Sequence, residues 1–161
     1  MLLRPATAAD AAATAAIYNA EVLGSRVTFD LVTRSVEEQA GWLDARSGAL
    51  EVVVAEVDGA VAGYASLSAY RERAAYRTTV EDSVYVHADH RGAGVGRALL
   101  DEIVDVARER GFHSVIARIV ADHTASIRLH AAVGFQHVGV EREVGRKFGR
   151  WLDVAVMQLL L

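Results

Sequence analysis

The stretch Arg91-Gly92-Ala93-Gly94-Val95-Gly96-Arg97 places a glycine at every second position and constrains the fold on both sides of it. The valine-containing run Ser83–Val86 precedes it, and residues 98–104 follow it with the apolar spacing of a helix. Glycine lets the backbone approach a ligand closely, because no Cβ intervenes. The free N–H groups and the dipole at a helix start favour a phosphate or pyrophosphate. The stretch therefore predicts a strand, an anion-binding turn and a helix.

Two widespread phosphate-binding motifs do not fit these residues. A P-loop needs lysine and then serine or threonine after its last glycine, whereas Arg97 and Ala98 follow Gly96. A dinucleotide-binding turn needs a glycine or alanine five residues after its first glycine. Counted from either of the first two glycines, that position is Arg97 or Leu99. A nucleotide-binding domain is disfavoured, and a glycine-rich turn without a ligand stays open as an alternative.

Composition limits the classes of protein and partner. With 161 residues the chain is expected to form a single domain over residues 1–161. Its net charge of −4 disfavours nucleic-acid and membrane partners. The absence of cysteine excludes disulfides and thiolate metal sites and is compatible with a cytoplasmic location. Residues Met1–Pro5 lack the apolar core of a signal peptide, and no apolar run is long enough for a spanning helix.

Hydrophobic periodicity and turn residues predict a mixed α/β domain with the element order β-αα-βββ-α-β-α-ββ. Asp58-Gly59 is a strong signal for a hairpin, and Gly111 and Gly134 are expected to end helices. The predicted strands are Leu2–Arg4, Glu51–Val57, Val61–Ala69, Thr79–Val86, Val115–Val120, His137–Val144 and Trp151–Leu160. The predicted helices run from Thr7 or Asp10 to about Leu23, onward from the capping residue Ser35, over Gly94–Arg110 and over Thr124–Val133.

The glycine stretch resembles the R/Q-x-x-G-x-G/A signature of the GNAT superfamily of N-acetyltransferases, and the predicted element order is also the order of that fold. Five further motifs resemble the phosphinothricin and methionine sulfoximine acetyltransferase group. In chain order they are Tyr18-Asn19, Arg73–Arg77, Val80–Val86, Gly134-Phe135 and Lys147–Trp151. The resemblance covers nearly the whole chain. It implies a mixed twisted sheet flanked by helices, acetyl-CoA as co-substrate, and a small amino-acid-like amine as acceptor.

The same resemblance implies where acetyl-CoA binds. The glycine stretch would hold its pyrophosphate, and backbone N–H groups near Tyr85 and Val86 would stabilise the oxyanion of the reaction. The helix that begins near Thr124 would add contacts from its first turn, although His123 stands where the superfamily usually has asparagine. The expected cofactor-binding residues are Tyr85, Val86, Arg91, Gly92, Ala93, Gly94, Val95, Gly96, Arg97, His123 and Ser126.

Glu81 is the expected catalytic base, because the related group has its proposed catalytic glutamate there and a carboxylate can take the proton of the attacking amine. Strand alternation places Glu81, Ser83 and Tyr85 on one face, while Asp82 lies on the other, where a helix should pack. Asp82 is therefore expected to be structural. A solvated carboxylate at a strand end is the alternative for Glu81. His130 occupies the place of a superfamily proton donor, or is simply a packed helix histidine.

The acceptor site is expected to involve arginines and aromatic side chains. Arg71, Arg73 and Arg77 offer forks for a carboxylate, or form a solvated loop. Phe29 either walls the acceptor pocket or belongs to the core. Phe148 matches the methionine sulfoximine branch, whereas phosphinothricin enzymes have histidine there.

Further residues limit the expected acceptor, metal content, mechanism and oligomeric state. Arg146 replaces a common aromatic residue, which together with Phe148 favours a methionine derivative or a general L-amino acid over phosphinothricin. His87 and His90 are too few ligands for a metal site, so none is expected. Without cysteine, direct attack in a ternary complex is expected. The alternative to an N-acetyltransferase is a non-catalytic acyl-CoA-binding module. The resemblance also implies a homodimer, with Val154–Leu161 in either the interface or the core.

Overall fold

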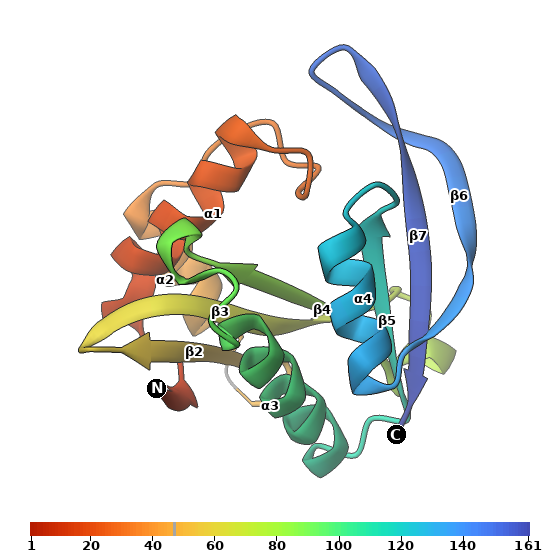
Figure 1. The fold of residues 1–161 in the computed structure, drawn as a ribbon. Helices are drawn as coiled ribbons and strands as arrows, with labels where there is room; N and C mark the ends of the chain where they lie inside the picture. Colours follow the sequence, from red (N-terminus) through yellow and green to blue (C-terminus); the bar gives the residue numbers. More distant parts are fainter. Residues whose placement is uncertain (47) are drawn as a thin grey trace.

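The computed structural model describes residues 1–46 and 48–161. The strands form one mixed sheet in the order β1-β2-β3-β4-β5-β7-β6, with helices on both faces (Figure 1). The strands are β1 (Leu2–Pro5), β2 (Val52–Val57), β3 (Ala60–Ala69), β4 (Thr79–Val86), β5 (Ser114–Val120), β6 (Gln136–Lys147) and β7 (Arg150–Leu160). The α-helices are α1 (Ala11–Gly24), α2 (Val36–Asp44), α3 (Val95–Glu109) and α4 (Thr124–Val133). Short 3-10 turns cover Ala8–Asp10, Ala74–Tyr76 and Ala88–His90. None of the helices in the described ranges is long and apolar enough to span a bilayer.

The predicted element order is confirmed, and local signals explain where the helices begin and end. Ser35 caps α2 in a capping box, in which the Glu38 N–H donates to the Ser35 hydroxyl at 3.1 Å. After the C-terminal end of α3, Gly111 takes φ +79° and the Phe112 N–H donates to the Ala107 carbonyl at 3.0 Å. This is the glycine stop that the sequence predicted.

The last hairpin is longer than predicted, because the pairing of β6 with β7 continues to Lys147 and Arg150. Phe148 and Gly149 form a two-residue turn with φ +49° and +74°, as tight hairpins require. The predicted end at Val144 was wrong, and the strand ends instead at Lys147. Its ammonium group is buried and donates to the Thr28 carbonyl at 2.9 Å, a tertiary contact that sequence periodicity does not show.

The C-terminal strand β7 lies mostly in the core. Val154, Ala155 and Met157 are buried, whereas Leu160 is exposed. The hairpin tip of β6–β7 extends beyond the sheet on the side of the segment that follows α1 (Figure 1).

The sheet has two hydrophobic faces and one discontinuity. Helix α3 buries Leu99, Leu100 and Ile103 against one face, and α1 buries Ile17 and Tyr18 against the other. Strands β4 and β5 are parallel but pair only from Thr79 to Glu81, with Ser114 to Ile116 as partners. Beyond that point β5 continues its pairing with β7 alone. The two central strands therefore separate halfway along their length.

Gly63 of β3 lies tightly against β4 and Leu99 of α3, and its replacement by alanine is expected to destabilise the fold. An added Cβ would lie 2.7 Å from the Tyr85 carbonyl oxygen and 3.0 Å from Leu99. Overpacking of this kind costs about 1–3 kcal/mol. Urea unfolding measures the loss. Gly139→Ala is the control, since no described atom lies within 4 Å of its added Cβ; equal stability of the two variants would contradict this packing.

Candidate active site

The separation of β4 from β5 leaves backbone groups of β4 without a strand partner on that side. The His87 N–H donates to Ala62 of β3 at 2.8 Å. Because polar groups alternate along an antiparallel strand, the Tyr85 N–H also faces β3, whereas the Val84 and Val86 N–H groups face the gap. The Val86 carbonyl indeed points away from β3 and accepts from the Arg91 side chain at 3.3 Å. Of the two expected oxyanion donors, Val86 therefore has the suitable orientation.

The glycine turn after β4 forms an open cradle at the start of α3. Gly92 and Gly94 take φ +75° and +84°, and no described atom lies within 4 Å of a Cβ added to either. The first helical hydrogen bond joins the Ala98 N–H to the Gly94 carbonyl at 3.1 Å. The N–H groups from Val95 to Arg97 therefore precede the hydrogen-bonded ladder and are available to an anion. Such a cradle fits a pyrophosphate.

The other residues of this turn position its backbone. The Arg91 guanidinium forms an ion pair with Glu21 of α1, and Arg97 bonds to Asp101 at 2.6 Å and to the Ala132 carbonyl at 3.1 Å. The Val95 side chain is buried in the core, so it offers a ligand only its backbone, whereas Ala93 is exposed. The adjoining cavity is lined by Glu21, Ser25, Val27, Val84, Tyr85, Val86, Arg91, Gly92, Gly96, His123, Ala125, Ser126 and Leu129.

Gly94→Ala is expected to weaken acetyl-CoA binding by about tenfold or more, because it strains the turn that aims the free N–H groups at an anion. The left-handed conformation alone costs about 1–2 kcal/mol of stability for alanine. Gly111→Ala is the matched control, since Gly111 has φ +79° and no described atom within 4 Å of an added Cβ. Urea unfolding should show similar destabilisation of both variants. Calorimetric titration with acetyl-CoA should show a loss of affinity only in the Gly94 variant. An unchanged affinity would place the pyrophosphate elsewhere.

His123 and Ser126, at the start of α4, connect the cradle to the gap between β4 and β5. Both residues line the cavity beside the cradle and a second cavity in the gap. Burial lowers the pKa of His123 below its usual value, with a smaller opposing effect of Glu21. A neutral imidazole can both donate and accept a hydrogen bond, as the side-chain amide of an asparagine can.

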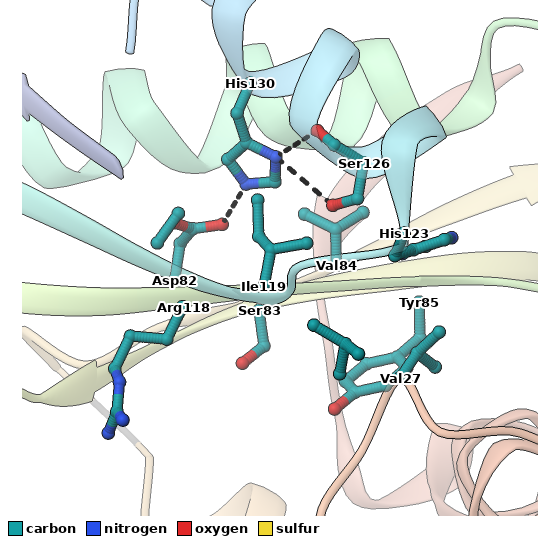
Figure 2. A pocket seen from close by; sticks show the side chains of 12 residues that line it. Val27, Asp82, Ser83, Val84, Tyr85, Arg118, Ile119, His123, Ser126 and His130 are labelled. Carbon is teal, nitrogen blue, oxygen red and sulfur yellow. Dashed lines mark hydrogen bonds and ion pairs between the residues drawn. The ribbon is translucent and has the colours of Figure 1, made fainter. Parts of the chain in front are cut away.

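On the helix-facing side of the gap, His130 and Asp82 form a buried pair (Figure 2). The exposed fractions are 3% and 6%, and His130 Nε2 lies 3.0 Å from Asp82 Oδ2. His130 Nδ1 lies 2.8 Å from the Ser126 carbonyl, which can only accept, so Nδ1 bears a proton. Burial lowers the pKa of His130, but the hydrogen bond and charge of Asp82 outweigh it and raise the pKa above the usual value. Asp82 thus packs on a helix, as predicted.

Glu81 lies on the opposite face of β4, next to Ile116 in β5 and Ser68 in β3. Burial raises its pKa above the usual range, and the positive charge of Arg118 opposes that effect. The negative charges of Asp82 and Glu141 raise the pKa further. Glu81 is therefore a half-buried, more basic carboxylate than a solvated one, which suits acceptance of a proton from an amine.

An aromatic cluster that sequence analysis missed covers this face of β4. The Tyr85 ring stacks on Tyr64 and meets the edge of Tyr18, each at 5.3 Å between centroids. Burial raises the pKa of the Tyr85 hydroxyl. The Tyr18 hydroxyl bonds to Asp30 and lies 3.0 Å from the Thr28 hydroxyl. The positions of Tyr18 and Tyr85 in two family motifs were the available signals, but nothing in the sequence showed that these rings meet, because the contacts join residues distant in the chain.

The arginines that bear on the choice of acceptor lie in two places, the segment before β4 and the outer hairpin. Arg71 lies above the Tyr70 ring at 4.9 Å and is one of the charges that act on Glu81. Arg73 shares a surface hollow with Arg71, and Arg77 is exposed on the segment before β4. The Arg146 guanidinium lies 5.3 Å from the Trp151 ring centroid, within the hairpin.

The two predicted phenylalanines lie near the outer hairpin. The Phe29 ring is partly exposed and occupies the space beside Gly145 of β6, so it is not a core residue. Phe148 is 60% exposed at the hairpin turn. The His87 and His90 rings meet edge to face with 5.8 Å between centroids, and within residues 1–46 and 48–161 no cluster of three or more ligand-type side chains is arranged to hold a metal.

Comparison with known proteins agrees with this geometry. The family model of the acetyltransferase (GNAT) domain matches residues 3–156. The chain is 44% identical over 162 residues to the L-amino acid N-acyltransferase MnaT of Escherichia coli, covering 100% of this chain and 94% of that protein. It is 43% identical over 162 residues to the L-methionine sulfoximine/L-methionine sulfone acetyltransferase of Salmonella typhimurium, covering 100% and 94%.

Two solved structures are similar over the whole chain. One, with a TM-score of 0.97 and 43% identity, is a putative acetyltransferase from Salmonella typhimurium with its cofactor acetyl-CoA, and the match covers 100% of this chain and 94% of that one. The other is named ribosomal-protein-alanine N-acetyltransferase, from Brucella melitensis, with a TM-score of 0.98, 43% identity and 100% coverage of both chains.

Proposed function

Since the chain belongs to the GNAT family of acetyltransferases, we propose that it acetylates the α-amino group of a small L-amino acid. It is an enzyme that uses acetyl-CoA as co-substrate for N-acetylation. The observation that supports the proposal most is a single strand, β4, which has Glu81 at its third residue and leads into the glycine cradle. The proposed proton acceptor and the proposed pyrophosphate site thus lie on one strand and the turn that follows it.

In the proposed mechanism the acceptor amine attacks the acetyl carbonyl directly within a ternary complex. Glu81 accepts the amine proton, directly or through water, and its raised pKa suits that task. The Val86 N–H stabilises the oxyanion from the gap beside β5, and the N–H groups of the cradle hold the pyrophosphate. The chain has no cysteine to form an acyl intermediate.

His130 is proposed as the source of the proton that the departing thiolate needs. Its raised pKa shifts the ring toward the protonated form, which can supply a proton. Since both ring nitrogens are hydrogen-bonded, the proton must leave one of those bonds as the thiolate departs. His123 and Ser126, between the two cavities, are proposed to contact the cofactor along this path.

The acceptor is proposed to be a methionine derivative, such as the sulfoximine or sulfone, or a related L-amino acid. The identity to relatives with those names supports this class. Phe29 and Phe148, near the outer hairpin, are proposed to wall the site, and Arg71, Arg73 and Arg77 to attract the polar end of the acceptor. Phosphinothricin is expected to be a poorer acceptor because Phe148 replaces a histidine.

A cytoplasmic location and a homodimer are also proposed. The absence of cysteine is compatible with a reducing compartment. Exposed apolar side chains along the outer hairpin, at Val138, Val140, Val144, Phe148 and Trp151, offer a surface for a second copy. Sedimentation velocity at micromolar concentration should give twice the chain mass, and a monomer at all concentrations would contradict the dimer.

The mechanism is tested by two-substrate kinetics with L-methionine sulfone and acetyl-CoA. Intersecting double-reciprocal lines and an unchanged intact mass after incubation with acetyl-CoA alone are expected. Parallel lines together with an acetylated enzyme would contradict direct attack.

A further inference from the structure

We propose that Arg118 of β5 binds the α-carboxylate of the acceptor and thereby selects amino acids over simple amines. This inference rests on the proposed function and adds a residue that determines specificity. It assigns the carboxylate to the strand side of the site and leaves Arg71 and Arg73 to the polar side chain of the acceptor.

The position of Arg118 follows from the sheet register. Glu81 pairs with Ile116 in the parallel ladder, so these two side chains share a face. Two residues further along β5, Arg118 returns to that same face. Figure 2 shows Arg118 on the side of Ser83 and Tyr85, opposite the Asp82–His130 pair.

Arg118 is also at the opening where the reaction must occur. The two strands separate directly after Glu81, and Arg118 lines the cavity in the gap together with Ser83 and Tyr85. Its positive charge is the strongest charge effect on the pKa of Glu81, after the larger effect of burial. Arg118 and Glu81 therefore lie on either side of the point where the strands separate, and the charge of the guanidinium acts on the carboxylate that is proposed to deprotonate the amine.

The guanidinium has donors to spare. Nη2 forms an ion pair with Glu141 of β6, and within the described residues no other hydrogen bond of this side chain is found. Arginine has five N–H donors in a planar fork, so Glu141 orients the group while the remaining donors can meet a second carboxylate. The side chain is 37% exposed, so a ligand can reach it.

Acceptor chemistry favours Arg118 over the other nearby cation. In an α-amino acid the amine and the carboxylate are on the same carbon, so the carboxylate must lie beside the base that serves the amine. Arg71 also acts on Glu81, but it is exposed and packs over Tyr70 and Tyr76. Arg118 alone of the two lines the gap.

The test compares L-methionine sulfone with the corresponding amine that lacks the carboxylate. Wild type should prefer the amino acid in kcat/KM. Arg118→Met should lower kcat/KM for the amino acid about 10- to 100-fold more than kcat/KM for the simple amine, mainly through the KM of the amino acid, with the KM for acetyl-CoA little changed. Arg118→Lys, which retains the charge but loses the fork, should lie between. Arg108→Met, at an exposed arginine of α3, is the matched control.

Equal loss with both acceptors would overturn the proposal, because Arg118 would then act through Glu81. A variant that keeps the wild-type preference for the amino acid would overturn it as well. Those results leave the proposed function intact as long as wild type acetylates the amino acid. If wild type acetylates neither compound nor any other amino acid, the proposed function itself is contradicted and the role of Arg118 with it.

Discussion

Glu81→Gln is expected to lower kcat by about 10²- to 10⁴-fold, the usual contribution of a positioned general base. Glutamine has nearly the same shape but cannot accept the amine proton. Because Glu81 lies on the face of β4 opposite Asp82 and does not line the cavity beside the glycine cradle, acetyl-CoA affinity should stay unchanged. Steady-state rates of thiol release and calorimetric titration with acetyl-CoA measure the two quantities.

The pH profile adds a second readout for the same residue. Burial raises the pKa of Glu81, so the limb of kcat/KM that reports its deprotonation lies above pH 4.5 and rises with pH. That limb should disappear in the glutamine variant, whereas the limb due to the acceptor amine remains. Glu109→Gln, at an exposed carboxylate of α3, is the control. A wild-type rate in the Glu81 variant would remove Glu81 from the mechanism.

His130→Ala is expected to cost about 3–5 kcal/mol of unfolding free energy, because it leaves the Asp82 carboxylate buried without its partner. Urea unfolding at pH 6 measures the loss. The double variant with Asp82→Ala should lose less than the sum of the two single variants, since the second change removes the uncompensated charge. Additive losses would show that the two side chains are not coupled.

The pH dependence of this pair has a definite sign. The pKa of His130 is raised in the folded state, so the stabilisation is complete below the unfolded value of about 6.5 and is lost as the pH rises through the folded value. The stability difference between wild type and the Asp82→Asn variant should therefore be larger at pH 6 than at pH 9. A difference that grows with pH would contradict the assignment of the proton to His130.

Much of the fold could be predicted because its strand and helix ends depend on local sequence signals. Strand Thr79–Val86 was predicted to the residue, and the left-handed glycines Gly111 and Gly134 end α3 and α4 as expected. The capping box that begins α2 lies within the four residues from Ser35 to Glu38. Glycine positions and caps act over a few residues, so a single sequence is sufficient to recognise them.

The features that join distant residues could not be predicted in the same way. The extension of β6 depends on Lys147 reaching Thr28, which is 119 residues away in the chain. Asp82 and His130 are 48 residues apart, and only the separation of β4 from β5 places Arg118 at the site. No periodicity or spacing reports such contacts. Alternation along β4 did predict the two faces, but not which partners would occupy them.

The central claim, that the acceptor is a free amino acid, is tested most directly by one comparison of initial rates. Thiol release from acetyl-CoA is measured with free L-methionine sulfone and with a short peptide that begins with alanine. The free amino acid should accelerate release and yield its N-acetyl derivative, with a higher kcat/KM than the peptide. Release that responds only to the peptide, or to neither amine, would contradict the claim.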